Sequence, residues 1–283
     1  MATVQDTILI REMTPDDING AVELSYEQEW PHRQEDWESY LSLGEGVVAE
    51  CEGRIVGTTM AWRYAPTYAT LGMVIVANAF QGKGLGRQLM QTMLDRLEGC
   101  SVLLNATEAG APLYQKFGFE KIGTIHQHQG TAPMVPLAQL RPGERVRPLG
   151  SADSELADLY DRACGMGRGK LFESLGRTGS AVVLAQDHVP VGFANMRRFG
   201  RGWSVGPIVA PDLTGAKALA SHWIGAYAGS FCRLDVPAEG GFSEWLAELG
   251  LPKVGEVHTM VRGTAPVTGD NCRLFGLVSQ ALG

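Results

Sequence analysis

The chain of 283 residues is long enough for two ordinary domains, and its 45% hydrophobic and 19% charged residues exclude an intrinsically disordered protein. Twenty-four Lys and Arg against 31 Asp and Glu give a net charge of −7. This balance argues against a broad nucleic-acid or anionic-membrane surface but allows a small local anion site. Five cysteines at least 40 residues apart form no CxxC pair, so neither a zinc site nor a disulfide framework is predicted.

Targeting signals are not visible in the sequence. The first residues lack the basic stretch and apolar core of a secretory signal, and the longest mostly apolar run, Met73 to Phe80, is far too short to span a membrane. We therefore expect a cytoplasmic protein that does not associate with membranes.

The predicted elements alternate between strands and helices. The first half predicts a strand at Ile8–Arg11 and a helical stretch that begins near Thr14, whose side chain suits a helix cap. Strands follow near 47–51, 54–62 and 68–76, then a helix, a strand, a short helix and a final strand. The second half predicts strands near 181–186, 190–197, 202–209 and 231–236 and helices near 215–228 and 242–249, with the glycine-rich, basic Gly165–Lys170 as a loop.

Landmarks of the first half recur in the second half in the same order. Arg11 precedes Arg147 by 136 residues, Gly72 precedes Gly206 by 134, and Gly123 precedes Gly255 by 132. A slowly drifting offset is what a duplicated domain with small loop differences produces. We therefore predict an α/β (α+β) protein with domains at residues 1–130 and 146–283, joined by a linker at 131–145 within a proline-rich stretch.

The most informative segment runs from Gly72 to Arg87, where an apolar strand leads into the glycine-rich turn Gln81–Gly86 and then directly into a helix. One buried face of that helix is predicted by the spacing of Leu85, Leu89, Met90, Met93, Leu94 and Leu97. Glycines let several backbone N–H groups converge on an anion, and a helix N-terminus adds positive potential. With Lys83 and Arg87 as further cations, the segment predicts an anion-binding cradle.

Two familiar phosphate motifs do not match this cradle. A P-loop requires Ser or Thr after its lysine, whereas Lys83 is followed by Gly84, and glycines at 82, 84 and 86 do not have the GxGxxG spacing. The strand end about 20 residues later, Leu104–Ala106, also lacks the acidic residue of a dinucleotide site. A tight strand-to-helix connection that binds nothing is the alternative interpretation.

Two segments in this order resemble the signatures of the GNAT superfamily of N-acyltransferases. Gln81-x-x-Gly84-x-Gly86 resembles that family's loop for the pyrophosphate of acyl-CoA. The stretch from Leu104 to Phe119, with Tyr114 ahead of an aromatic-Gly-Phe turn, resembles its second signature. The resemblance is clear over about residues 7–128, and the second half is similar to the C-terminal domain of a two-domain subgroup.

The resemblance implies tandem GNAT-like domains, each with a mixed, mostly antiparallel sheet flanked by helices. It also implies an acetyl-CoA-dependent N-acetyltransferase, without a metal, that acetylates a primary amine of a small molecule or peptide. In this family the strand before the loop holds the pantetheine and polarises the carbonyl. The implied acetyl-CoA contacts are Val74, Ile75, Val76, Gln81, Gly82, Lys83, Gly84, Leu85, Gly86, Arg87 and Asn105.

Tyr114 is the predicted general acid. Acyl transfer from a thioester to an amine needs a neutral amine, a stabilised oxyanion and a proton for the leaving thiolate. A phenol of pKa about 10 is a suitable donor. The alternative is a core aromatic side chain that packs with Phe117.

The general base is not identifiable from the sequence. Glu27, Glu29, Glu35 and His32 fall in the region that shapes the acceptor pocket in the resembling family, and Trp30, His32 and Trp37 would give it aromatic walls. Taken singly, each is more typical of a solvated or packing residue. His126-x-His128 shares one strand face, but surface histidines are favoured over a metal site without a third ligand. For Asp235, a turn carboxylate is favoured over a ligand for a cationic substrate.

The second half departs from the pattern where the chemistry would need it. Ala210–Lys217 keeps one glycine where the first copy has three, and Leu246 stands where Tyr114 would be expected. We expect a domain that has lost its cofactor loop and completes the acceptor site. The rival hypothesis is a non-catalytic acyl-CoA-binding or sensing module. Amino acids, polyamines, aminoglycosides and peptide amines stay open as acceptors, as does a homodimer.

Overall fold

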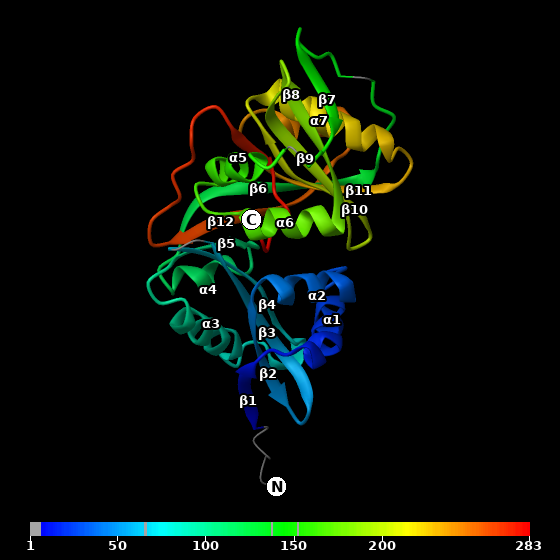
Figure 1. Cartoon of the computed structure of the whole chain (residues 1–283). Coiled ribbons are helices and arrows are strands. Elements are labelled where there is room, and N and C mark those ends of the chain that lie inside the picture. The colour runs from blue at the N-terminus through cyan, green and yellow to red at the C-terminus, as the bar shows by residue number, and fades with distance from the viewer. Residues whose placement is uncertain (1–6, 65–66, 137, 152) are drawn as a thin grey trace.

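The computed structural model describes residues 7–64, 67–136, 138–151 and 153–283. Figure 1 shows two halves stacked one above the other, with long strands crossing between them. The elements of the first half are β1 (Ile8–Glu12), η1 (Pro15–Asp17), α1 (Ile18–Glu27), α2 (Gln34–Leu43), β2 (Glu45–Cys51), β3 (Arg54–Tyr64), β4 (Tyr68–Val76), η2 (Asn78–Phe80), α3 (Leu85–Arg96), β5 (Ser101–Ala106), α4 (Ala111–Gln115) and β6 (Glu120–Thr131). Those of the second half are β7 (Glu144–Pro148), α5 (Leu156–Cys164), α6 (Gly169–Thr178), β8 (Gly179–Gln186), β9 (Val189–Phe199), β10 (Gly202–Ala210), α7 (Leu213–Ala226), β11 (Phe231–Pro237), α8 (Phe242–Glu248), β12 (Lys253–Arg262) and β13 (Arg273–Gly276).

The strands of the described residues form one mixed sheet in the order β1-β2-β3-β4-β5-β12-β6-β11-β10-β9-β8-β7, with β13 paired to β10. Most neighbours are antiparallel, while β4–β5 and β10–β11 are parallel. The predicted α+β class and the predicted mixed, mostly antiparallel sheet are confirmed.

The two halves exchange their long strands at the centre of this sheet. β12 of the second half lies between β5 and β6, and β6 of the first half pairs with β11. Ile125 is paired with Val257, which is 132 residues further along the chain (257 minus 125). Because this is the offset of the repeat, corresponding residues face each other where the two halves meet, as a pseudo-two-fold axis requires. The predicted units share one sheet, and the boundary between them stays a prediction.

A strand bulge also recurs in both halves, as the repeat predicts. Gly72 and Ile75 of β4 face Met60 and Thr58 of β3, so β4 carries one extra residue there. β10 carries the same irregularity between Val205 and Ile208. The register matches Gly72 to Val205 rather than to Gly206, so our glycine-based alignment is displaced by one residue at this point.

The third repeated feature is a charged clamp after the first strand of each half. The Arg11 guanidinium donates two hydrogen bonds to the Asp17 carboxylate, at 2.7 and 2.8 Å. Arg147 and Asp153 repeat the arrangement at 2.6 and 2.7 Å. Both pairs are separated by six residues and pin the start of the following helical stretch to the strand.

Helices cover both faces of the sheet in each half. In the first half, α1 and α3 pack against β3 from opposite sides (Figure 1). The predicted buried face of α3 is confirmed, because Leu85, Leu89, Met90, Met93, Leu94 and Leu97 are all buried. In the second half, α7 covers one face, and its Leu219 and Ile224 are fully buried in a core with Phe242 and Leu246 of α8.

One sequence expectation needs correction in the second half. The predicted loop Gly165–Lys170 already enters α6 at Gly169, since Leu171 and Leu175 supply a buried face for a helix. Arg168 in that segment is buried, with its guanidinium 4.1 Å from the Tyr64 ring centre. The chain after Gly263 is largely exposed as far as Asn271 and then enters the interior, with β13 and the buried Val278.

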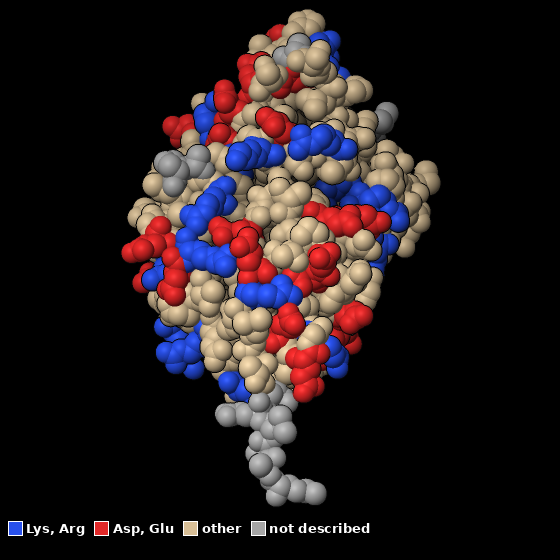
Figure 2. Space-filling model, turned by 60° about the horizontal axis from the view of Figure 1, so that its bottom comes forward, with Lys and Arg blue, Asp and Glu red and all other residues tan. Residues whose placement is uncertain are grey.

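Acidic and basic side chains are interspersed over the face shown in Figure 2, as the modest net charge predicts. Within the described ranges, none of the helices has the length and apolar character needed to cross a membrane.

Candidate active site

A wedge opens in the sheet between β4 and β5. The two strands pair in parallel through Thr70 and Leu103, which form the last register pair. Beyond it, β4 continues beside β3 and β5 continues beside β12, so the strands part. The bulge of β4 lies at this opening: Met73 adopts a left-handed φ of 52°, and its carbonyl accepts a 2.8 Å hydrogen bond from the Thr58 hydroxyl. The predicted contacts Val74, Ile75 and Val76 therefore form the β4 side of the wedge.

The glycine-rich turn closes one end of this wedge. Gly82 and Gly84 have φ values of 73° and 85°, and a Cβ atom at either would meet nothing within 4 Å. Gly84 is the N-cap of α3, and no side chain caps the exposed N–H groups of its first turn. Lys83 and Arg87 are exposed beside it. Open space, uncapped N–H groups and two cations together fit a bound phosphate.

Three of the predicted acetyl-CoA contacts, Gln81, Leu85 and Gly86, pack against the protein and do not face the open side of the glycine-rich turn. The Gln81 amide donates to the Val76 carbonyl at 3.0 Å and to the Asn78 side-chain oxygen at 3.1 Å, which fixes the turn to the end of β4. Leu85 is buried in the core. A Cβ on Gly86 would lie 3.7 Å from both Leu113 and Val76, so α4 packs close to the start of α3.

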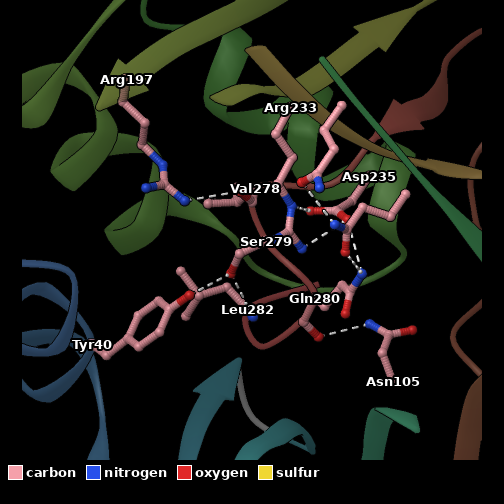
Figure 3. Close-up of polar contacts among 11 residues, drawn as sticks. Tyr40, Asn105, Arg197, Arg233, Asp235, Val278, Ser279, Gln280 and Leu282 are labelled. Carbon is pink, nitrogen blue, oxygen red and sulfur yellow. Dashed lines mark hydrogen bonds and ion pairs between the residues drawn. The ribbon is translucent and has the colours of Figure 1, made fainter. Parts of the chain in front are cut away.

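Asn105 connects the wedge to the end of the chain. Its side-chain amide donates to the Gln280 carbonyl at 2.8 Å (Figure 3). The side-chain oxygen accepts from the Thr259 hydroxyl at 2.8 Å. Both ends of the amide are therefore occupied by the protein, and Asn105 holds the C-terminal segment in place.

Tyr114 lies on α4, directly after β5. Its side chain is half-buried and packs edge-to-face against Phe119, with the ring centres 6.1 Å apart. Burial raises the pKa of Tyr114 to about 12, so its hydroxyl stays protonated at physiological pH. No partner for this hydroxyl is found among the described residues. The arrangement provides a hydrogen-bond donor beside the wedge.

The corresponding wedge of the second half is filled. β10 and β11 pair in parallel through Ser204 and Arg233 and then part, as β4 and β5 do. β13 occupies the opening: it pairs with β10 through Ile208–Gly276 and Val209–Leu274. The next residue, Leu277, donates its N–H to the Asp235 carbonyl of β11 at 2.8 Å. The chain itself thus takes the place that stays open in the first half.

The helix after the second wedge is capped by the protein's own anion. Asp212 is the N-cap of α7, and its carboxylate accepts from the Gly215 N–H at 2.9 Å and pairs with Arg141 at 2.7 Å. A carboxylate stands where a phosphate would have to bind. On α8, the position of Tyr114 is taken by the buried Leu246.

A cavity of about 200 Å³ lies where the two halves meet, on the bulge side of the first wedge. Its wall from the first half includes Glu29, Trp30, His32 and Met73. Its remaining wall is built from β6 of the first half and from β11 and the β9–β10 turn of the second half, with Gln127, Gln129, Phe199, Arg201 and Arg233. Ser279, Gln280 and Ala281 of the C-terminal segment complete it.

The candidate base residues separate clearly in space. Glu29 and His32 line the cavity, whereas the Glu27 carboxylate accepts from the Asn78 N–H at 2.7 Å and Glu35 lies 3.8 Å from Arg33. Trp37, predicted as an aromatic wall, is instead fully buried and donates to Ser25. Trp30 and His32 are the aromatic side chains of this loop that reach the cavity.

Sequence reasoning missed most of the environment formed by β6 and β11. Asp235 is not a turn carboxylate: it lies inside β11, is buried, and accepts two hydrogen bonds from Arg233 and one from the Gln280 amide (Figure 3). His128 is not a surface residue either, because both ring nitrogens are bonded, to the Leu251 carbonyl and to Ser243. The alternation of Gln127, His128 and Gln129 could have signalled a polar strand face. Nothing in the C-terminal sequence signals that it reaches the cavity.

No group of three or more His, Cys, Asp or Glu side chains that could hold a metal ion is present in the described ranges.

Comparison with known proteins agrees with this geometry. Two models described as the acetyltransferase (GNAT) domain match residues 42–121 and 156–276, one in each half. An uncharacterized N-acetyltransferase, YitH of Bacillus subtilis, is 28% identical over 221 residues, which is 76% of each chain.

Solved structures share the whole architecture. A Pyrococcus horikoshii protein described as a candidate acetyltransferase matches with a TM-score of 0.82 and 20% identity over 100% of this chain and 98% of that one. A tandem GNAT protein from the clavulanic acid biosynthesis pathway matches with a TM-score of 0.65 and 13% identity over 92% of this chain and 100% of that one. The two family matches together cover 201 of 283 residues (80 and 121), and the chain belongs to the GNAT acyltransferases as a tandem member with one GNAT domain in each half.

Proposed function

We propose that this enzyme transfers the acetyl group of acetyl-CoA to a primary amine of a small molecule, and that the transfer takes place in the first half alone. The observation that carries the proposal is the difference between the two wedges. The first has an open bulge and an uncapped helix N-terminus, whereas the second holds β13 and the Asp212 carboxylate.

The residues of the first wedge fit the parts of acetyl-CoA. The backbone N–H groups of Gly82–Gly86, with Lys83 and Arg87, would hold the pyrophosphate. The backbone edge of Val74–Val76 that faces away from β3, beyond the last β4–β5 register pair, would bind the pantetheine arm, which carries amide groups of its own. Because the N–H groups at the bulge lie outside the strand register, they are available to stabilise negative charge on a carbonyl oxygen.

The reaction is direct attack in a ternary complex. The neutral amine nitrogen attacks the thioester carbonyl carbon, the C–N bond forms and the C–S bond breaks. The nitrogen loses one proton and the leaving thiolate gains one. Acetyl-CoA supplies the acetyl group and the leaving thiol, and no other co-reactant is needed.

Tyr114 supports departure of the thiolate. Its raised pKa of about 12 makes it a weaker acid than a thiol of pKa about 8.5. Tyr114 therefore stabilises the sulfur chiefly by donating a hydrogen bond, while solvent restores any proton that moves. Full general acid catalysis contributes about 100- to 10,000-fold, and because Tyr114 donates a hydrogen bond rather than a proton we expect a smaller contribution of about 10- to 100-fold.

The acceptor would enter from the cavity between the halves, because Met73 of the bulge is part of its wall. A cavity of about 200 Å³ favours a small molecule over a protein segment. The second half then contributes side chains to the acceptor site rather than a second cofactor site.

An acceptor screen that follows free thiol tests the proposal. With acetyl-CoA present, we expect one class of primary amines to accelerate thiol release and to yield the N-acetyl product by mass. Binding of acetyl-CoA without thiol release across a broad amine panel would instead favour the non-catalytic binding module. Absence of acetyl-CoA binding by folded protein would overturn both.

A further inference from the structure

We infer that the acceptor is an amino acid, an amine that carries a carboxylate, and that this one cavity binds both of its charges, the carboxylate at Arg201 and Arg233 and the amine at Glu29. This inference rests on the proposed acetyl transfer and specifies its substrate class.

Guanidinium groups of the second half form the part of the cavity that would bind the carboxylate of the acceptor. Arg201 lies exposed in the turn between β9 and β10 and lines the cavity, and it has no ion-pair partner among the described residues. Arg233 uses Nε and Nη2 to bind Asp235, which leaves Nη1 as a free donor on the cavity wall. Its side chain is 15% exposed while that of Asp235 is 1% exposed, so the cation and not the anion faces the cavity.

A third guanidinium strengthens the positive potential. Arg197 lies 4.5 Å and Arg233 lies 5.7 Å from the centre of the Phe199 ring, so two cations flank one aromatic wall of the cavity. Figure 3 shows Arg197 and Arg233 on either side of the C-terminal segment. Arg197 is buried, donates to the Val278 carbonyl at 2.9 Å, and its Nε has no partner among the described residues. An anionic group nearby would stabilise this incompletely paired charge.

Glu29 is the acidic side chain that lines the same cavity, and we assign the amine of the acceptor to it. Glu29 follows α1, adopts a left-handed φ of 59°, and is exposed with no ion-pair partner in the described part of the chain. Its carboxylate can attract an ammonium group and accept, directly or through water, the proton that the amine must lose before it attacks. Met73 of the bulge lines the same cavity, so the amine would be released close to the reacting carbonyl.

His32 supplies a neutral hydrogen-bonding group to the wall of the same cavity. Burial and the nearby Arg233 and Arg197 lower the pKa of His32 to about 4, which keeps its ring uncharged at neutral pH. Its Nδ1 is buried and has no hydrogen-bond partner among the described residues. A polar substrate in the cavity would satisfy this atom.

The same charges disfavour the polycationic acceptor classes. A polyamine or an aminoglycoside would bring several positive charges towards Arg201 and Arg233, and like charges repel at this range. The positive charge of the cavity therefore disfavours polycationic acceptors, although the overall charge of −7 does not exclude them.

Paired acceptors test the inference. Each of the twenty amino acids is compared with its carboxamide, and spermidine is included as a polycation, with thiol release and product mass as readouts. We expect the preferred amino acid to exceed its carboxamide in kcat/KM by about 10- to 100-fold, the value of one or two charged hydrogen bonds. Amines without a carboxylate that react as well as the acids, or acetylation of no amino acid at all, would overturn it.

A matched pair of variants locates the carboxylate. Arg201→Gln should reduce the ratio of acid to carboxamide at least fivefold, while the acetyl-CoA Kd stays unchanged. Arg198→Gln removes the same charge from the end of β9, where the side chain stacks over Trp203 outside the cavity, and should leave the ratio intact. An unchanged ratio in Arg201→Gln would overturn the assignment of the carboxylate. If the folded wild-type enzyme does not bind acetyl-CoA, the proposed function itself is contradicted.

Discussion

At the scale of single residues, the two halves differ most at Tyr114 and Leu246, which stand at corresponding places on α4 and α8. The tyrosine is half-buried beside an open wedge, and the leucine is buried in a core beside a filled one. The hydroxyl of Tyr114 makes no structural hydrogen bond in the described residues, so its value to the protein lies in what it can donate to a bound molecule.

We therefore predict that Tyr114→Phe lowers kcat by about 10- to 100-fold and leaves the acetyl-CoA Kd within twofold of wild type. Stopped-flow or steady-state thiol release gives the first quantity and calorimetric titration the second. A joint loss of turnover, affinity and thermal stability would show that the residue acts as packing against Phe119.

Arg87 is the second residue whose role is separable from folding. It is exposed on the first turn of α3 and makes no ion pair with the described residues. Arg87→Glu should weaken acetyl-CoA binding by about tenfold or more at low ionic strength, and the difference should shrink with added salt. Arg262→Glu, an equal charge reversal at the exposed end of β12, is the control and should bind normally. Equal losses of acetyl-CoA affinity in both variants would show that the glycine-rich turn and Arg87 do not form the acetyl-CoA site.

At the scale of elements, the repeated clamps Arg11–Asp17 and Arg147–Asp153 fix each first strand to the helix that follows. The hydrogen bonds from Arg11 and from Arg147 hold the pKa values of Asp17 and Asp153 below their ordinary range. Because the folded-state pKa values are depressed, the stabilisation is complete above the ordinary aspartate pKa of about 3.9 and is lost as the pH falls through the folded values.

Asp153→Asn should therefore cost about 2 kcal/mol of unfolding free energy at pH 7. The gap to wild type should narrow as the pH falls below about 4. Urea unfolding at several pH values measures this, with Asp16→Asn, an exposed neighbour of the first clamp, as a variant expected to change little. A gap that does not change with pH would contradict the role of the ionised pair.

The elements also show which parts of the structure can be predicted from the sequence. The strand, glycine turn and helix from Tyr68 to Arg96 follow from local rules, since periodicity, glycine and helix capping act over a few residues. The second-half wall does not, because Arg233 and Asp235 acquire their environment from Gln280, which is 45 residues away from Asp235. The glycines ahead of Leu171 and Leu175 favour a loop, so the sequence does not predict the start of α6. Long-range pairing of this kind leaves no periodic signal.

At the scale of the whole molecule, the central strands β6 and β12 join the halves into one sheet. Each half supplies the strand that lies beside the other half's β5 or β11. Separate melting of the halves would break these ladders, so we predict a single cooperative transition whose calorimetric and van't Hoff enthalpies agree. Acetyl-CoA bound to the first half should raise the midpoint of the entire transition. Two transitions, only one of them shifted by ligand, would show that the halves unfold independently.

The central claim is that duplication has left one working cofactor site and turned the other into structure. Isothermal titration of the intact protein with acetyl-CoA tests it most directly, because the stoichiometry counts the wedges that can bind. We predict that one molecule of acetyl-CoA binds per chain, in the open wedge between β4 and β5. A stoichiometry of two, or no binding by folded protein, would contradict it.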